Sequence, residues 1–231
     1  MKMSICLKQF DPPARNFRTR RSLAAMLAAA WLATPPALAD VSPESLDAAR
    51  RHVQDTVSDI KAIPYPDGVG DGVAPETVAA FRDSLSEHAD LALIARFVSG
   101  IHWRGMDDGA RKRFRQAYTA WLVARYADRF RTYRDGDIRI GEVSEDRRDR
   151  ATVQSTGTGG GRDPVDILWR VHSRSGGWLV YDIVIADVSL LITERETVGS
   201  LFETHRGDID RVISDIESRL ETKTGQSGAP S

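Results

Sequence analysis

The sequence VDILWRVH, at residues 165–172, alternates apolar and polar side chains. Alternation with a period of two is typical of a β-strand that has one buried face. The same period extends outward on both sides, and turn-forming segments at 157–162 and 173–177 separate the repeats. Such segments join antiparallel strands as hairpins. We therefore predict a four-stranded antiparallel sheet with strands over residues 138–143, 151–156, 165–172 and 178–186.

Outside these strands the apolar residues recur every three or four positions, which is the period of an amphipathic helix. Residues suited to helix N-termini, such as the Ser42-Pro43 pair and Asp90, precede the helical patterns. Helices, then an antiparallel sheet, then helices indicate an α+β fold in which a curled sheet packs against several helices. The helices are expected to begin near Pro43, Pro75, Asp90, Asp108, Leu190 and Asp208.

The N-terminus has the three-part layout of an export signal. Basic residues come first, an apolar run follows at 23–32, and Ala37-Leu38-Ala39 forms a small-x-small cleavage pattern. An apolar run of this length is too short to remain as a membrane-spanning helix. We predict a signal peptide over residues 1–39, cleavage before Asp40 and a periplasmic mature protein. The Arg20-Arg21 pair leaves open whether the Sec or the twin-arginine route is used.

The mature chain would hold one domain, residues 40–221, followed by a polar tail at 222–231 that we expect to be disordered. The single cysteine, Cys6, lies within the signal, so the mature protein would contain no disulfide. Loss of the signal leaves 26 basic residues against 32 acidic ones. A net charge of about −6 argues against a dedicated nucleic-acid binder, which usually has a strongly basic domain.

Few residues suggest metal, nucleotide or nucleophile chemistry. The glycines at 157–161 lack the lysine and the following helix of a phosphate-binding loop, and the five histidines show no metal-ligand spacing. We therefore predict no metal and no cofactor. Asp182 lies in an otherwise apolar strand and has two interpretations. It is either a catalytic acid or base, as in isomerases built on a cone-shaped curled sheet, or a structural acceptor that fixes the end of the strand.

Basic and aromatic side chains mark the long helix expected after Asp108. Between residues 110 and 134 there are eight basic residues and one internal acidic residue, Asp128. These cations either form a solvated face or attract anionic head groups or an acidic partner. Large rings recur at helical spacing, and they fill a solid core as readily as they line a pocket.

The segment GGWLVYDIVI, at residues 176–185 and followed by Val188-Ser189-Leu190, resembles a signature of the MlaC (toluene-tolerance) family. In that family a Gly-Trp turn leads into a strand that ends near Tyr-Asp, and a Val-Ser-Leu helix start follows. Upstream, Gly100 to Arg104 resembles the family's Gly-x-x-Trp-Arg motif, and residues 114–126 resemble its aromatic helix. The similarity covers nearly the whole mature chain in the same order.

The resemblance implies a fold like an NTF2-like cone, with an apolar lipid cavity enclosed between sheet and helices. It also implies a non-enzymatic carrier of phospholipid across the periplasm. The implied partners are an outer-membrane lipoprotein complex and an inner-membrane ABC transporter complex with a substrate-binding ring. Two alternatives remain: the same fold carrying a hopanoid or other polycyclic lipid, and an NTF2-like isomerase that uses Asp182.

We predict that two walls of the cavity contact lipid. One wall belongs to the helices, and the other belongs to the third and fourth strands. The helical residues are Phe97, Trp103, Tyr118, Trp121, Leu122 and Tyr126, and the strand residues are Ile167, Trp169, Val171, Trp178 and Val180.

Overall fold

The computed structural model describes residues 43–66, 73–131, 136–159, 162–174 and 177–226. All of them belong to one compact unit, Leu38–Ser231. The predicted signal peptide and its cleavage site lie outside the described residues. None of the helices in these ranges combines the length and the apolar content that crossing a bilayer demands.

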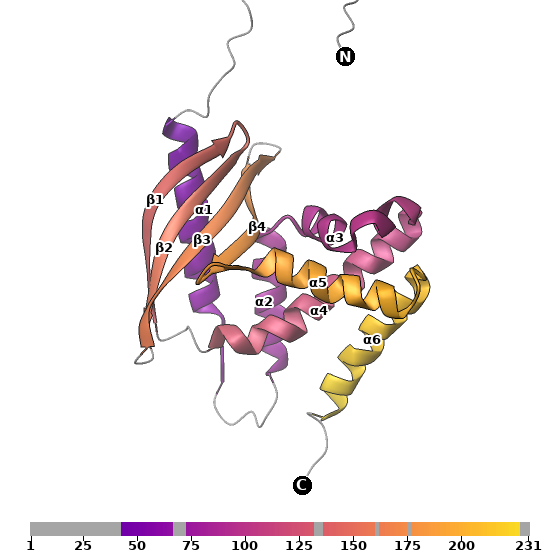
Figure 1. Ribbon diagram of the computed structural model, residues 1–231. Coiled ribbons are helices and arrows are strands. Elements are labelled where there is room, and N and C mark those ends of the chain that lie inside the picture. The colour runs from indigo at the N-terminus through magenta and orange to yellow at the C-terminus, as the bar shows by residue number, and fades with distance from the viewer. Residues whose placement is uncertain (1–42, 67–72, 132–135, 160–161, 175–176, 227–231) are drawn as a thin grey trace, which may run out of the picture. The chain divides into compact units, whose positions relative to one another are not determined.

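In the part of the chain that the structure describes, five antiparallel strands form one sheet in the order β1-β2-β3-β4-β5 (Figure 1). The α+β class is confirmed, but the sheet has five strands rather than four and is not closed, so the expected NTF2-like cone is not confirmed. The additional strand has two residues and pairs with the end of β4. The strands are β1 (Asp137–Arg147), β2 (Arg150–Gly159), β3 (Arg162–Arg174), β4 (Gly177–Ile185) and β5 (Val188–Ser189).

A bulge interrupts the pairing of β3 with β4. Val171 lies opposite Val180, but the preceding Arg170 lies opposite Asp182, so Tyr181 is an extra residue on β4. Because opposed residues share a face of the sheet, the bulge turns Asp182 onto the face opposite to that of Val180. Ala186 and Asp187 then take positive φ values of 48° and 65° and form the tight turn into β5.

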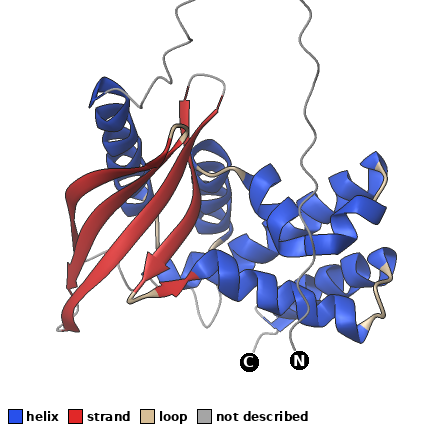
Figure 2. Ribbon diagram, turned by 45° about the horizontal axis from the view of Figure 1, so that its top comes forward, coloured by secondary structure: helices blue, strands red, loops and turns tan. Residues whose placement is uncertain are grey.

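Six α-helices and one 3-10 segment accompany the sheet within the described ranges. The first helix lies along one face of the sheet, and α3 to α6 gather beyond its β4 side (Figures 1 and 2). Their starts agree with the sequence-based expectations. The helices are α1 (Pro43–Ala62), α2 (Pro75–His88), α3 (Leu91–Ser99), α4 (Asp108–Arg131), α5 (Leu190–Thr204) and α6 (Ile209–Gln226), and η1 spans Gly100–Gly105.

The core consists of two apolar clusters. Ala49, Val53 and Val57, spaced four residues apart on α1, are buried against the inner faces of β2, β3 and β4. A larger cluster joins α2 to α6, with Phe114, Tyr118 and Phe202 among its most buried members. The helices of this second cluster therefore contact the sheet mainly near β4 and leave the remaining sheet face to α1.

Asp90 fixes the joint between α2 and α3 to the sheet. Its carboxylate accepts the Leu93 backbone N–H at 2.9 Å, as an N-cap, and contacts His172 Nε2 at 3.0 Å and Arg174 at 2.9 Å. Its own backbone N–H donates to the Val180 carbonyl. Burial alone would raise the pKa of Asp90, but the Leu93 N–H and the Arg174 guanidinium outweigh it and hold the pKa below 3.8.

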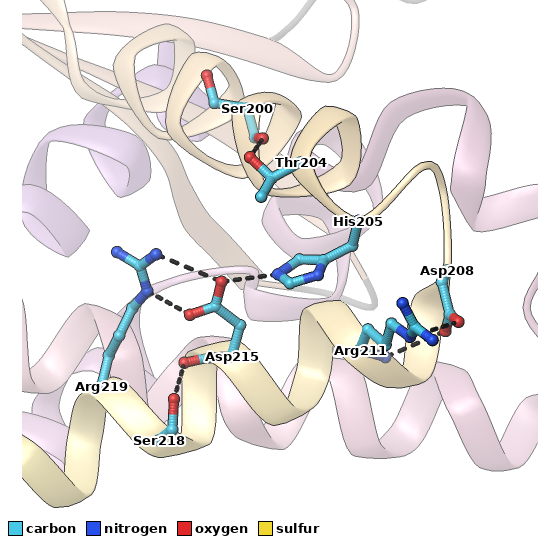
Figure 3. Close-up of polar contacts among 8 residues, drawn as sticks. All are labelled: Ser200, Thr204, His205, Asp208, Arg211, Asp215, Ser218 and Arg219. Atoms are coloured by element: carbon cyan, nitrogen blue, oxygen red, sulfur yellow. Dashed lines mark hydrogen bonds and ion pairs between the residues drawn. The ribbon is translucent and has the colours of Figure 1, made fainter.

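A second polar network joins α5 to α6 (Figure 3). His205, just after α5, contacts the Asp215 carboxylate at 2.8 Å, and Arg219 binds the same carboxylate from one turn further along α6. Asp208 caps α6 through the Arg211 backbone N–H. The helix then continues to Gln226, so residues 222–226 of the predicted disordered tail are helical, and 227–231 lie outside the described residues.

Candidate functional site

An apolar cavity of about 120 Å³ lies where the two core clusters meet. Its wall combines α1, α2, α3, α4 and α5 with β3 and β4, and the side chains that form it are mostly hydrocarbon and aromatic. Polar groups converge at a few points only, a pattern typical of small-molecule and lipid sites. The principal apolar lining residues are Ile60, Phe81, Leu85, Ile94, Tyr118, Leu122, Tyr126, Phe130, Trp169, Val180, Ile183, Leu190 and Leu191.

Five of the eleven predicted lipid-contacting residues line this cavity. Tyr118, Leu122 and Tyr126 extend from α4, while Trp169 and Val180 come from β3 and β4. The Trp169 indole N–H donates to Ser155 Oγ at 2.9 Å, which lets the ring remain buried without an unpaired polar atom. The long helix and the sheet therefore face each other across the cavity at these positions.

The other three predicted strand residues lie elsewhere. Ile167, Val171 and Trp178 belong to the cluster that packs around α1 and do not line the cavity. The reason is that α1 lies along this face of the sheet, where the sequence-based prediction placed the long helix. A contact between these three residues and lipid remains a prediction.

The remaining helical residues, Phe97, Trp103 and Trp121, pack partly buried against the helical cluster outside the cavity lining. Each of the three rings lies beneath an arginine guanidinium. The distances to the ring centroids are 4.7 Å for Arg195 over Phe97, 5.6 Å for Arg111 over Trp103 and 5.7 Å for Arg125 over Trp121. These aromatic residues therefore support cations at the surface of the helical layer.

The α2 helix contributes a part of the wall that the predicted site did not include. Phe81, Ser84, Leu85 and His88 line the cavity from this helix. The four-residue spacing of Phe81 and Leu85 is typical of the apolar side of a helix, but the sequence carries no signal for which neighbour that side contacts. The predicted helical wall therefore included residues of α3, η1 and α4 but none of α2.

Glu194 is a second buried carboxylate of the site besides Asp182, and no pattern in the sequence pointed to it. Its side chain, on α5, is almost fully buried. It accepts the Tyr126 hydroxyl at 2.7 Å and the Trp121 indole N–H at 3.4 Å, and it forms an ion pair with Arg125 at 3.1 Å. A carboxylate surrounded in this way by donors and one cation is stable inside an apolar wall.

Burial and then the Glu194 carboxylate raise the pKa of Tyr126 to about 12. We expect a near-ultraviolet titration, read as the difference between the protein and a Tyr126→Phe variant, to show this tyrosine ionising near pH 12. The unfolded tyrosine ionises near pH 10, so the stability that Tyr126 contributes is complete below pH 10 and is lost between pH 10 and 12. A difference signal centred at pH 10 would contradict the buried pairing.

Asp182 lines the cavity, but both of its oxygens have partners. One accepts the Leu191 backbone N–H at 3.0 Å, and the other accepts the Ser189 hydroxyl at 2.8 Å and the Arg170 guanidinium at 3.0 Å. These bonds tie the β4 strand to the start of α5. The geometry favours the structural interpretation of Asp182 over the catalytic one.

Among the described residues, Asp59, Glu87 and His88 form a group whose ligand atoms all lie within 4.8 Å of one another. Such a group could hold a metal ion. His88 Nε2 lies 2.7 Å from the Asp59 carboxylate, and a simple imidazole–carboxylate pair accounts for that contact without an ion. The two carboxylates are exposed, while the imidazole is buried beside the cavity.

The chain is similar to known proteins in both sequence and fold. A family model for the MlaC protein matches residues 66–218, well over half of the chain. The fold is similar to the structure of a phospholipid-binding protein from Ralstonia solanacearum, solved in complex with a phospholipid. That match has a TM-score of 0.66 and 19% sequence identity, and it covers 80% of this chain and 99% of the other. No curated protein matches the chain.

Proposed function

Because the chain belongs to the MlaC family, we propose that it is a lipid carrier that shelters the acyl chains of a phospholipid in the cavity between α2, α4, α5 and β4. The apolar character of this cavity is the observation that carries the proposal. The relative from Ralstonia solanacearum binds a phospholipid on the same fold, which supports it. We propose binding without catalysis, since the cavity carboxylates of Asp182 and Glu194 are both held by neighbouring donors.

The energetics of lipid transfer require such a cavity. Each methylene exposed to water costs about 0.8 kcal/mol, so a phospholipid with roughly 30 of them does not cross an aqueous space unaided. A protein that encloses the chains removes most of that barrier. With no nucleotide-binding motif in the sequence, direction would arise from differential affinity at the two ends of the route.

The cavity must widen before it accepts both chains. Its volume of about 120 Å³ is close to that of an engineered cavity of about 150 Å³ that holds one benzene molecule. Two acyl chains need several times more space. We propose that α2 and α4 move away from β4 on loading, because each of the three elements lines the cavity with a partly buried side chain, such as Leu85, Phe130 and Ile183.

Membership of the family supports a proposal for the route and the partners. We propose that the signal peptide delivers the mature protein to the periplasm. There it would exchange lipid with an outer-membrane lipoprotein complex and with the substrate-binding ring of an inner-membrane ABC transporter complex. We place the lipid against the five predicted residues that line the cavity and against Phe81, Leu85 and Leu191.

Native mass spectrometry of the protein purified from a bacterial periplasm tests this function. We expect a co-purified diacyl phospholipid, identified by its mass and released on unfolding. A bound hopanoid would instead support a carrier of polycyclic lipids. Protein without lipid, combined with an isomerase activity that Asp182→Asn removes, would reject the carrier function in favour of an enzyme.

A further inference from the structure

Tyr118 has a buried polar group in the cavity wall, and the shelter of acyl chains alone does not explain it. Its side chain is 1% exposed and lines the cavity, and its hydroxyl has no hydrogen-bond partner among the described residues. Most buried polar groups in folded proteins are paired, so an unpaired hydroxyl in a cavity wall needs a reason. A group on the bound ligand would supply the missing partner.

The groups beside Tyr118 already have partners. Glu194 accepts the Tyr126 hydroxyl at 2.7 Å and pairs with Arg125 at 3.1 Å, so the negative charge is balanced without Tyr118. Burial, reinforced by the Glu194 charge, raises the pKa of Tyr118 well above 10. The hydroxyl therefore keeps its proton and is a donor. The same carboxylate disfavours an anionic acceptor such as the carboxylate of a free fatty acid.

The groups on and around α4 are of the kinds that a phospholipid needs. Two guanidinium groups lie toward solvent, the partly exposed Arg125 over the Trp121 ring and the exposed Arg129 over the Tyr126 ring. The Tyr118 hydroxyl is buried on the same helix, in a cavity wall whose other side chains are mostly apolar. A diacyl phospholipid offers phosphate to the cations, ester carbonyls to a buried donor and hydrocarbon chains to the apolar wall.

We infer that the Tyr118 hydroxyl donates a hydrogen bond to an acyl ester carbonyl of the bound lipid. The cavity then selects ester-linked lipids over ether-linked analogues and free fatty acids. This inference rests on the proposed function, because it requires a lipid in the cavity. His88 also lines the cavity and has a buried Nδ1 without a partner. When its Nε2–H donates to Asp59, that nitrogen is an acceptor, and an ester carbonyl offers it no proton.

Paired ligands test the inference. Delipidated protein is titrated with a diacyl phosphatidylethanolamine and with the dialkyl ether analogue that has the same chains and head group. We expect the wild-type protein to prefer the diacyl lipid by about three- to tenfold, the range that one neutral hydrogen bond contributes. Tyr118→Phe should bind both lipids equally, with the affinity that the wild type shows for the ether. The matched control is Tyr65→Phe, whose hydroxyl donates to the Ala127 carbonyl outside the cavity lining, and it should keep the wild-type preference.

The possible results distinguish a failure of the ester contact from a failure of the proposed carrier function. Failure of both lipids to bind rejects the carrier function and the inference together. Equal affinity of the wild type for both lipids, or an equal loss for both in Tyr118→Phe, overturns the ester contact and leaves the carrier function standing. In urea without lipid, Tyr118→Phe should unfold at the same or a slightly higher concentration, because it removes an unpaired buried hydroxyl. A clear fall would show a structural role and would also overturn the inference.

Discussion

Replacement of Ser84 by tryptophan is expected to abolish lipid co-purification while the protein stays folded. Ser84 lines the cavity from α2 and is partly exposed, so a larger side chain has space to enter. The cavity measures about 120 Å³, and an indole takes up most of a space of that size. If the ring excludes about four methylenes of an acyl chain, affinity falls by roughly 3 kcal/mol, which is more than a hundredfold.

The matched control for this substitution is two residues further along the same helix. Ser86 is exposed and does not line the cavity, so Ser86→Trp adds the same ring to the surface of α2. We expect this variant to co-purify with as much lipid as the wild type, measured by native mass spectrometry, and both variants to keep the wild-type circular dichroism spectrum. Lipid retained by folded Ser84→Trp would show that the chains bind elsewhere.

Replacement of Asp90 by alanine is expected to cause the largest loss of stability, about 2–4 kcal/mol in urea unfolding at pH 7. The substitution removes the N-cap of α3, worth about 1 kcal/mol. It also leaves the buried His172 imidazole without its acceptor and releases Arg174, which adds roughly 1–3 kcal/mol. Asp208→Ala is the control, because Asp208 caps α6 at the surface without a buried network, and it should cost only about 1 kcal/mol.

The pH dependence of the Asp90 effect has a definite sign. In the folded protein the pKa of Asp90 lies below 3.8, while the unfolded carboxyl titrates near that value. The stability that Asp90 contributes is therefore complete above about pH 5 and decreases as the pH falls through the folded pKa. The difference between wild type and Asp90→Ala should shrink as the pH falls below 4. A difference that grows on acidification would contradict the assigned network.

The predicted helices and strands agree with the structure because most of them carry strong local signals. The strand at 165–172 alternates clearly, and Asp90 is the helix cap that its sequence position suggested. The fifth strand was missed because the turn before it, Ala186-Asp187, lacks the glycine or asparagine that usually marks two residues with positive φ. The two-residue length of β5 is also too short to show a period.

Five of the eleven residues predicted to contact lipid line the cavity described here, and the others lie elsewhere for two physical reasons. Amphipathic patterns show which side of an element is buried, but they do not identify the neighbour that covers it. Here α1 covers the sheet face that holds Ile167 and Val171, so these apolar residues pack against a helix. The bulge at Tyr181 also breaks the alternation of β4. Trp178 and Val180 share a face of the sheet with Ile183 and Ile185, so the spacing along that face is three residues between Val180 and Ile183 instead of two.

Glu194 shows a different limit of sequence reasoning. Its role depends on Tyr126, Trp121 and Arg125, which lie about 70 residues earlier on α4. Nothing in the local sequence ITERE distinguishes Glu194 from the exposed Glu196 two positions later. Long-range polar partners of this kind become visible only once helix packing is known.

A crystal structure of the protein purified with its lipid from the periplasm tests the central claim most directly. We expect continuous hydrocarbon density in the cavity beside Leu85, Leu122 and Val180, with α2 and α4 further from β4 than in the lipid-free structure. A lipid-loaded protein whose side chains interlock at that position, with the chains bound at another surface, would contradict it.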